Sequence, residues 1–288
     1  MGFALGQEII NIFRGKIVDL DIMAKKKFGI EKELNNLNTL IVGSSHIQNA
    51  FIPHKGEFNL SMASQDLYYS YELIKKYDTD KIKNFVISFS VFNPGFQIIK
   101  TSQFHKCLLY KILFDIDYQF KDSAKEKHLY EREVIYRFII KRYLKNFKAD
   151  ENYLGEIDKY SVSKKKSSDE YLKNYIDGNI KNNLRENEQI NFVTKIIEYA
   201  AQNNKNVFWI ITPHSEFYRK QIPDKKTLFK KLYEKCSNKS NVEIIDLFDD
   251  NRFFEDDFLD CDHLNRKGAE KFSEIIEQIL HSHNYTLS

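Results

Sequence analysis

The stretch Leu40-Ile41-Val42-Gly43-Ser44-Ser45-His46-Ile47-Gln48-Asn49 is the one around which the rest of the chain is organised. Its apolar beginning ends abruptly in small residues, and a polar segment compatible with a helix follows. In an open α/β sheet this pattern is typical of a strand that turns directly into a helix, and ligands bind at that edge. A serine at such a turn has its N–H near the positive end of the helix, which favours a nucleophile. Small residues also make ordinary turns and helix caps, so both interpretations stand at this point.

Four more apolar stretches of strand length follow along the chain. We expect strands over residues 58–63, 84–90, 207–211 and 242–245. Apolar residues at helical spacing lie between them, and the clearest set belongs to the last segment: Phe272, Ile275, Ile276, Ile279 and Leu280. Five strands that alternate with helices predict an α/β protein of three layers (α/β/α), in which helices cover both faces of a five-stranded parallel sheet.

The alternation is interrupted over residues 96–185, where the chain becomes irregularly helical, aromatic and basic. This length exceeds that of a crossover helix, so we expect a helical cap inserted into the fold. The α/β domain then comprises residues 37–95 and 186–288, and residues 1–36 form an amphipathic helical segment outside the sheet. The basic run at residues 161–168 is typical of a solvated surface. Ser64 is the expected cap of the helix that follows the second strand.

Composition argues against several classes of function. The 288 residues carry 44 Lys and Arg against 41 Asp and Glu, and a net charge of +3 argues against a dedicated nucleic-acid binder. No stretch approaches the roughly 18 consecutive apolar residues of a membrane span. The first residues lack the pattern of a signal peptide, so we expect a cytoplasmic location unless an export signal has been removed. Cys107, Cys236 and Cys261 have no paired spacing, which predicts reduced thiols.

A second polar cluster, Asp260-Cys261-Asp262-His263-Leu264-Asn265, stands just before the last helix. A histidine three residues after an aspartate, in a loop at the carboxyl edge of the sheet, can face the same crevice as Ser45. Asp260 can then hold the imidazole of His263 in one tautomer while the other ring nitrogen accepts the serine proton. The alternative is that Asp260 or Asp262 caps the last helix and that His263 is only its neighbour.

These two blocks, in this place and order, resemble the SGNH (GDSL-like) hydrolase and acyltransferase superfamily. Gly43-Ser44-Ser45-His46 is similar to the family's first block, with Ser44 in place of the usual aspartate, which implies that Ser45 is the nucleophile. The segment from Asp260 to Gly268 is similar to the last block, Asp-x-x-His followed by Leu-Asn and a helical glycine. The resemblance implies that His263 is the base, that Asp260 is its partner, and that the sheet is flavodoxin-like. It covers residues 37–95 and 190–283 but not the insertion.

The family's two middle blocks supply an oxyanion hole, and both depart from the family pattern here. Asn59-Leu60-Ser61 has Ser61 where the family has a glycine, and a backbone donor survives that change. The segment from Ser88 to Asn93 lacks the family's glycine and trailing aspartate, with Asn93 as the side-chain donor and Ser90 as an alternative. The resemblance therefore implies an oxyanion hole of Ser45, Ser61 and Asn93. Loss of one such donor costs about 3 kcal/mol of transition-state stabilisation.

Two further histidines stand at strand ends and are candidates for substrate contact. His46 directly follows the expected nucleophile, and His214 follows Thr212-Pro213 at the end of the fourth strand. The alternatives are that His46 is an ordinary residue at a helix start and that His214 is a surface residue in a loop.

The resemblance implies an enzyme that handles O-acyl esters, and the variant first block with a large insertion is similar to members that modify bacterial surface polysaccharides. We therefore expect transfer of an acyl group, an acetyl in the first place, to a carbohydrate through an acyl-serine. Acetyl-CoA is a candidate donor, and hydrolysis needs no metal or organic cofactor. Hydrolysis of carbohydrate O-acetyl esters is one alternative. The other is a glycan-binding protein that keeps the fold without turnover, motivated by the departures in the third block.

Overall fold

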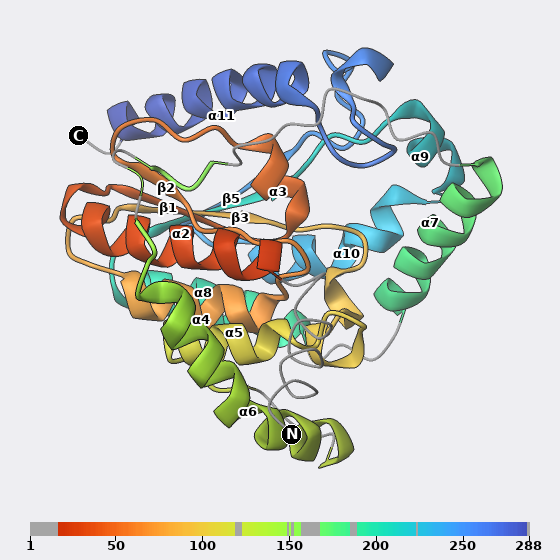
Figure 1. Ribbon diagram of the computed structural model, residues 1–288. Helices are drawn as coiled ribbons and strands as arrows, with labels where there is room; N and C mark the ends of the chain where they lie inside the picture. Colours follow the sequence, from red (N-terminus) through yellow and green to blue (C-terminus); the bar gives the residue numbers. More distant parts are fainter. Residues whose placement is uncertain are drawn as a thin grey trace.

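In the part of the chain that the computed structural model describes, five strands form one sheet in which every strand is parallel to its neighbours (Figure 1). The structure describes residues 17–118, 123–148, 150, 153–156, 168–184, 189–222 and 224–286. The strands are β1 (Thr39–Val42), β2 (Glu57–Asn59), β3 (Asn84–Ser88), β4 (Asn206–Ile211) and β5 (Val242–Asp246). The α-helices are α2 (Ile17–Glu33), α3 (Ser45–Ala50), α4 (Leu67–Tyr77), α5 (Lys106–Phe114), α6 (Ser123–Leu144), α7 (Asp169–Leu184), α8 (Ile190–Gln202), α9 (Glu216–Gln221), α10 (Lys225–Cys236) and α11 (Arg266–Thr286). Short 3-10 helices are η1 (Leu34–Asn36), η2 (Asn93–Gly95), η3 (Ile98–Lys100) and η4 (Glu255–Asp257).

Helices cover both faces of the sheet, which confirms the predicted α/β fold. Alternate residues of β1, β3, β4 and β5 contribute to two separate cores, because successive side chains of a strand point to opposite faces. Ile41 and Val86 belong to the core beneath α11 and α3, which lies above the sheet in Figure 1. Leu40 and Trp209 belong to the larger core on the other face, where α4, α5 and α8 pack.

The strand order β2-β1-β3-β4-β5 determines where a ligand site is expected. From β1 the chain steps outward to the edge strand β2, and it then returns to β3 on the other side of β1 before continuing to β4 and β5. In such a sheet a crevice opens outside the carboxyl ends of β1 and β3, where the connections diverge. Gly43 and Ser44 leave β1 at this point, and Phe89 and Ser90 leave β3 beside them.

The five expected strands are all present, with changes at their ends. β2 covers only Glu57–Asn59, whereas residues 58–63 were expected. The expected helix cap is wrong: α4 begins at Leu67, and Asp66 caps it by accepting the Tyr69 N–H at 3.1 Å. Ser64 has a φ of +64°, so it forms the turn that precedes the helix instead of capping it.

α2 is the described part of the expected N-terminal helical segment, because residues 1–16 lie outside the described residues. Its buried residues Leu20, Met23 and Ile30 join the larger core, and the helix packs on β2 and α5. Neither α2 nor any other helix that the structure describes is long and apolar enough to cross a bilayer.

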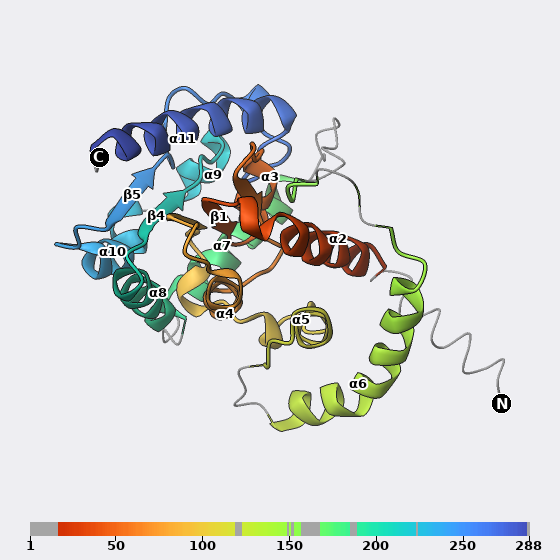
Figure 2. The same ribbon diagram turned by 90° about the vertical axis from the view of Figure 1, so that its left-hand side faces the viewer.

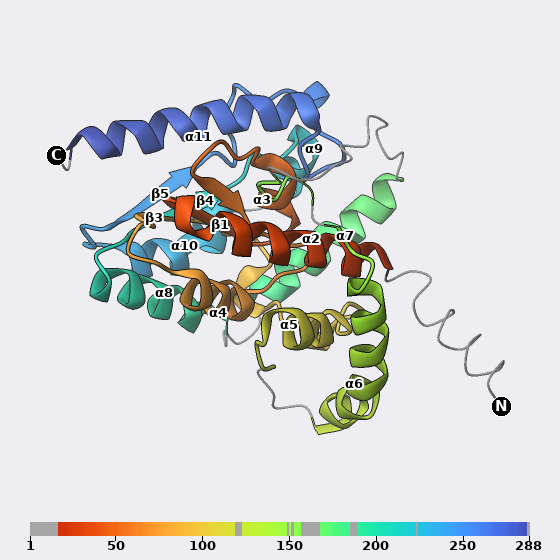
Figure 3. The ribbon, with the colours of Figure 1, turned by 60° about the vertical axis from the view of Figure 1, so that its left-hand side comes forward.

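All five strands lie within residues 37–95 and 186–288, and the described residues between these ranges form helices and loops without a strand. α5 is part of the larger core, since Leu108 and Leu109 are buried and the Tyr110 ring stacks on Tyr69 with centroids 3.9 Å apart. α6 lies farther from the sheet, beyond α5 (Figures 2 and 3). α7 packs against η2 and α9 at the carboxyl edge. Of the basic run at residues 161–168, all but the last residue lie outside the described residues.

A short stretch of the insertion, residues 153–156, lies along the edge strand β2. The Leu154 carbonyl accepts the Asn59 N–H at 2.9 Å. Lys26 of α2 is fully buried, and its Nζ donates to the carbonyls of Asn59 and Gly155 at 2.6 and 2.7 Å. This lysine therefore joins α2, β2 and the insertion at one place.

Candidate active site

The turn after β1 presents Ser45 at the carboxyl edge of the sheet. Gly43 has a φ of +142°, which residues with side chains rarely adopt, and a Cβ there would lie 2.1 Å from the Ser88 Oγ. The Ser44 N–H donates to the same Ser88 Oγ at 3.2 Å, so the end of β3 holds the turn in place. Ser45 follows as the first residue of α3. Glycine at position 43 is thus what this turn requires sterically.

The loop over residues 258–265, called the Asp-His loop below, carries Asp260 and His263 to the same edge. Asp260 Oδ1 accepts the N–H of Asp262 at 3.1 Å and that of His263 at 2.8 Å, which fixes its carboxylate beside the imidazole. The cap of α11 is Asn265, whose Oδ1 accepts the Gly268 N–H at 3.1 Å. Neither aspartate therefore takes the capping role that the alternative interpretation assigned to them.

The two segments bring a hydroxyl, an imidazole and a carboxylate into one line of hydrogen bonds. Ser45 Oγ lies 2.8 Å from His263 Nε2, although the residues are 218 positions apart. His263 Nδ1 lies 3.0 and 3.1 Å from the two carboxylate oxygens of Asp260. With Nδ1–H donating to Asp260, Nε2 is the nitrogen that can take the serine proton. The three residues predicted to be catalytic are thus in hydrogen-bonding sequence, an arrangement that can activate a serine.

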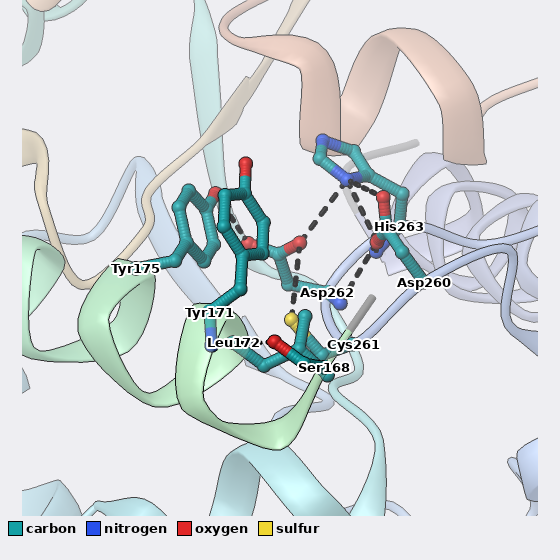
Figure 4. A pocket seen from close by; sticks show the side chains of 8 residues that line it. All are labelled: Ser168, Tyr171, Leu172, Tyr175, Asp260, Cys261, Asp262 and His263. Atoms are coloured by element: carbon teal, nitrogen blue, oxygen red, sulfur yellow. Dashed lines mark hydrogen bonds and ion pairs between the residues drawn. The ribbon is translucent and has the colours of Figure 1, made fainter. Parts of the chain in front are cut away.

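A second carboxylate, from Asp262, reaches the same imidazole nitrogen. Its Oδ1 lies 3.1 Å from His263 Nδ1, and its Oδ2 accepts from Tyr175 OH at 2.8 Å (Figure 4). The same Oδ2 lies 3.0 Å from His46 Nε2. From the sequence, Asp262 is expected only as a possible cap and Tyr175 is not singled out. The second acidic residue of Asp-x-Asp-His is the one sequence signal for this contact.

Neighbouring charges set the protonation of this cluster. Burial lowers the pKa of His263, but the carboxylates of Asp262 and Asp260 outweigh burial and raise it to about 10. Burial likewise raises the pKa of Asp262, yet His263 and His46 hold it well below its ordinary value. Asp262 is therefore an anion, and His263 holds a proton at neutral pH. The neutral imidazole that can accept the serine proton becomes the dominant form only in alkaline solution.

His46 is buried beneath the Asp-His loop, with an exposed fraction of 2%. Its Nδ1 lies 3.2 Å from Ser44 Oγ and 3.1 Å from Ser90 Oγ. Its ring stacks on that of His263, with centroids 4.9 Å apart. Both ring nitrogens of His46 are thus bonded to other side chains of the protein, and contact between His46 and a substrate stays a prediction.

His214 is also buried and is not the exposed loop residue of the alternative interpretation. Its Nδ1 bonds to the Thr212 carbonyl at 2.8 Å, and its ring lies between those of Tyr218 and His46, at centroid distances of 4.4 and 5.6 Å. Burial, reinforced by His46, lowers the pKa of His214 to about 3, so the ring is neutral. A role in substrate binding stays a prediction for this residue as well.

The predicted oxyanion donors Ser61 and Asn93 both make hydrogen bonds to nearby residues, but only the Ser61 N–H is used as a donor. The Ser61 N–H donates to Asn59 Oδ1 at 3.2 Å, and the same oxygen accepts the Ser61 hydroxyl. Asn93 lies in η2, where its Oδ1 accepts the Ser90 N–H. Both residues follow strands that end at the same edge as β1. Their part in an oxyanion hole stays a prediction, and for Ser61 it requires that the N–H leave Asn59.

A pocket of about 450 Å³ opens beside His263, between α7 and the Asp-His loop (Figure 4). The helix side is formed by Tyr171, Leu172 and Tyr175, and the loop side by residues 260–263. One wall is therefore aromatic and the other is polar and acidic. The volume lies within the range of small-molecule sites, which is about 300–1,000 Å³.

Two groups of side chains lie close enough together to hold a cation: His46, Asp262 and His263, and Asp260, Cys261 and Asp262. The imidazole nitrogens and carboxylate oxygens of the first group already bond to one another or to the hydroxyls of Ser44, Ser45, Ser90 and Tyr175. In the second group, burial and the flanking carboxylates raise the pKa of Cys261, which keeps the thiol protonated and makes it a poor ligand. Hydrogen bonding accounts for both clusters, and we assign no metal ligand or cofactor contact to these residues.

No family model and no curated protein matches the chain. The resemblance to the SGNH superfamily therefore stays a prediction from the quoted motifs. Fold and site together define a coarser class. The protein is an α/β protein whose five-stranded parallel sheet carries a serine, a histidine and an aspartate in hydrogen-bonding sequence at its carboxyl edge.

Proposed function

We propose that the protein is a serine-dependent O-acyltransferase of SGNH type that moves an acyl group, an acetyl in the first place, to a carbohydrate hydroxyl. The observation that carries the proposal is the hydrogen-bonded sequence of Ser45, His263 and Asp260. Its position at the divergence of the β1 and β3 connections adds support, because ligands of open α/β sheets bind there.

In the first half of the reaction, which starts from the neutral form of His263, Ser45 Oγ attacks the carbonyl carbon of the donor while His263 Nε2 takes the hydroxyl proton. Negative charge develops on the carbonyl oxygen, and the Ser45 N–H, the Ser61 N–H and Asn93 are the candidate donors to it. Collapse of the intermediate breaks the bond to the leaving group, which takes the proton from Nε2. The acyl group stays on Ser45 as an ester, and Asp260 holds the imidazole throughout.

In the second half, the acceptor hydroxyl gives its proton to Nε2 and attacks the acyl carbon, and Ser45 Oγ recovers the proton as it leaves. Water in place of the acceptor gives the esterase alternative. The pocket beside His263 is the proposed place of the acceptor, and transfer requires that its hydroxyl reach Nε2, where orientation lets it compete with water, an effect of several kcal/mol. The rings of Tyr171 and Tyr175 offer an apolar wall for the C–H face of a sugar ring.

The transfer reaction is tested by supplying an acetyl donor together with candidate oligosaccharides and following the products by mass spectrometry. Acetyl-CoA is the first donor to try, because a cytoplasmic location is expected, and a synthetic aryl acetate is the second. Acetylated sugar formed by the wild type and not by Ser45→Ala supports transfer. Acetate released at one rate with and without every acceptor, and no acetylated sugar, favours the esterase.

A glycan-binding protein without turnover is a second candidate, from a different class. The observation that favours it is the hydrogen bond from the Ser61 N–H to Asn59 Oδ1, which engages one of the candidate oxyanion donors within the protein. A serine-directed fluorophosphonate distinguishes the two. Labelling that disappears in Ser45→Ala supports the enzyme, whereas a folded wild type that stays unlabelled supports the binding protein.

A further inference from the structure

Asp262 is a buried carboxylate for which a Ser-His-Asp triad alone has no role. Its exposed fraction is 3%, and its Oδ1 contacts His263 Nδ1 at 3.1 Å. Its Oδ2 is held by His46 Nε2 at 3.0 Å and by Tyr175 OH at 2.8 Å. These donors come from α3 and α7, so two helices hold one carboxylate against the imidazole. Burying a carboxylate costs free energy unless partners compensate its charge. Here His263, His46 and Tyr175 provide that compensation.

His46 can hold Asp262 in place because hydrogen bonds at both of its ring nitrogens fix the orientation of its own ring. An ionised carboxylate can only accept, so His46 Nε2 carries the proton that it donates to Asp262 Oδ2. In the neutral ring, Nδ1 then accepts from the hydroxyls of Ser44 and Ser90, at 3.2 and 3.1 Å. Ser44 follows β1 and Ser90 follows β3, so the ends of two adjacent strands fix the orientation of the ring.

We propose that Asp262 is a second carboxylate partner of the His263 imidazole and that His46 is the positioning residue that keeps Asp262 in place. The inference rests on the proposed function, since it concerns the same histidine. It separates the roles of the two aspartates. Asp260, with 28% of its side chain exposed, orients the ring from the solvent side, and Asp262, with 2%, adds a buried negative charge beside it.

The second charge is expected to make His263 a stronger base. The titratable groups that face its ring are Asp260, Asp262 and Cys261 of the Asp-His loop, His46 of α3, Tyr175 of α7, and His214 after β4. Among these, the two carboxylates carry the negative charge, and together they stabilise the imidazolium that forms when the serine proton is transferred. The raised pKa of His263 is the resting-state counterpart of the same effect. Removal of either carboxylate should therefore shift the protonation of His263 to lower pH.

The first test is the pKa of His263, measured by NMR titration of its imidazole in the full chain. Asp262→Asn removes the charge but keeps the shape, and its amide oxygen can still accept from His46 and Tyr175. We expect the His263 pKa to fall by about one pH unit or more. The matched control is Asp249→Asn, which removes the same charge from a side chain that is 61% exposed and paired with Lys225. The control should leave the His263 pKa unchanged.

The second test concerns His46 and uses the rate at which a fluorophosphonate labels Ser45 over a range of pH. His46→Ala should slow labelling by about ten-fold, the lower end of the effect that loss of an orienting partner has at metal-ligating histidines. His46→Gln should restore most of the rate, because its amide can donate to Asp262. Asp260→Asn combined with Asp262→Asn should slow labelling by more than the product of the two single effects, because each carboxylate supports the ring when the other is lost.

An unchanged His263 pKa in Asp262→Asn, in a protein whose circular dichroism matches the wild type, overturns the proposal whatever the labelling shows. Equal labelling rates for His46→Ala and the wild type overturn the role of His46. A wild type that is not labelled, together with a lowered His263 pKa in Asp262→Asn, contradicts the proposed function but supports the second carboxylate. The two failures are therefore distinguishable.

Discussion

At the scale of single residues, Ser45, His263 and Asp260 differ in what their removal should cost. Ser45→Ala removes the nucleophile and His263→Ala removes the base, so each should abolish fluorophosphonate labelling and ester turnover while circular dichroism shows an intact fold. Asp260→Ala should retain measurable turnover, because Asp262 still contacts His263 Nδ1 at 3.1 Å. Full activity in His263→Ala would contradict the assignment of the base.

Gly43 is the residue on which the geometry of the Ser45 turn depends. Gly43→Ala is expected to lower the free energy of unfolding by about 1–3 kcal/mol, the cost of holding a residue with a side chain in a sparsely populated conformation. The new Cβ would also lie 2.1 Å from Ser88 Oγ. Urea unfolding monitored by fluorescence measures the change.

Gly178 of α7 provides the matched control for Gly43. Nothing lies within 4 Å of a Cβ built at Gly178, and Ala is favoured over Gly in a helix by about 0.5–1 kcal/mol. Gly178→Ala should therefore be neutral or slightly stabilising. If Gly43→Ala were as stable as Gly178→Ala, the turn after β1 would not be sterically constrained.

Ser45, Asp260 and His263 could be predicted from the sequence because each lies in a short block of fixed spacing beside a recognisable strand or helix. The partners of Asp262 could not be predicted from the sequence. Asp262 is free to contact the imidazole only because Asn265, and not Asp262, caps α11. Tyr175 lies in the insertion, and its place beside Asp262 depends on how α7 packs over the carboxyl edge. Local sequence carries no information about that packing.

At the scale of secondary-structure elements, Lys26 should make stability depend on pH. Burial lowers the pKa of this lysine from 10.5 to about 7. Between these values the unfolded chain holds a proton that the folded protein lacks, so the free energy of unfolding should rise as the pH increases. The rise attributable to Lys26 is at most about 1.4 kcal/mol per pH unit.

The measurement compares the wild type with Lys26→Met by urea unfolding between neutral and alkaline pH. Other titrating groups contribute equally to both proteins and cancel in the difference. The wild type should gain stability relative to the variant as the pH rises, because its buried amine no longer has to lose a proton on folding. Parallel curves would mean that Lys26 is charged in the folded protein.

The strands were predictable as elements because each is a short apolar run that ends in a turn signal. Two details of the elements were not. β2 stops at Asn59, although the N–H groups of Leu60 and Met62 still donate to the carbonyls of Ile41 and Gly43. The cap of α4 is Asp66 and not Ser64, because the chain needs a left-handed residue before it can enter the helix. Hydrophobic periodicity does not report either feature.

At the scale of the whole molecule, the described parts of the insertion should differ in how readily they open. α6 exposes Val134 and Phe138 by 75% and 65%, whereas every residue of β3 is buried. Amide hydrogen exchange should therefore be faster in α6 than in β3. α5 should be protected like α4, because both belong to the larger core. If α6 proved to be the best-protected element, the interpretation of this region as a peripheral cap would be wrong.

The three-layer fold could be predicted from the alternation of strand and helix patterns, since parallel strands require helical crossovers. The arrangement of the insertion could not, because a ninety-residue helical segment can pack in many ways on the same sheet. The structure divides it: α5 completes the larger core, and α7 forms the wall of the pocket beside His263.

Ser45 and His263 are 218 positions apart, so the ribosome adds them to the growing chain at different times. A chain that is synthesised from its N-terminus at about 5–20 residues per second presents the serine roughly 10–40 s before the histidine. During that interval Ser45 has no base beside it and is an ordinary alcohol. Reactivity toward acyl donors is expected to begin only when the Asp-His loop reaches the end of β1, so a nascent chain is inert until most of its sequence has been made.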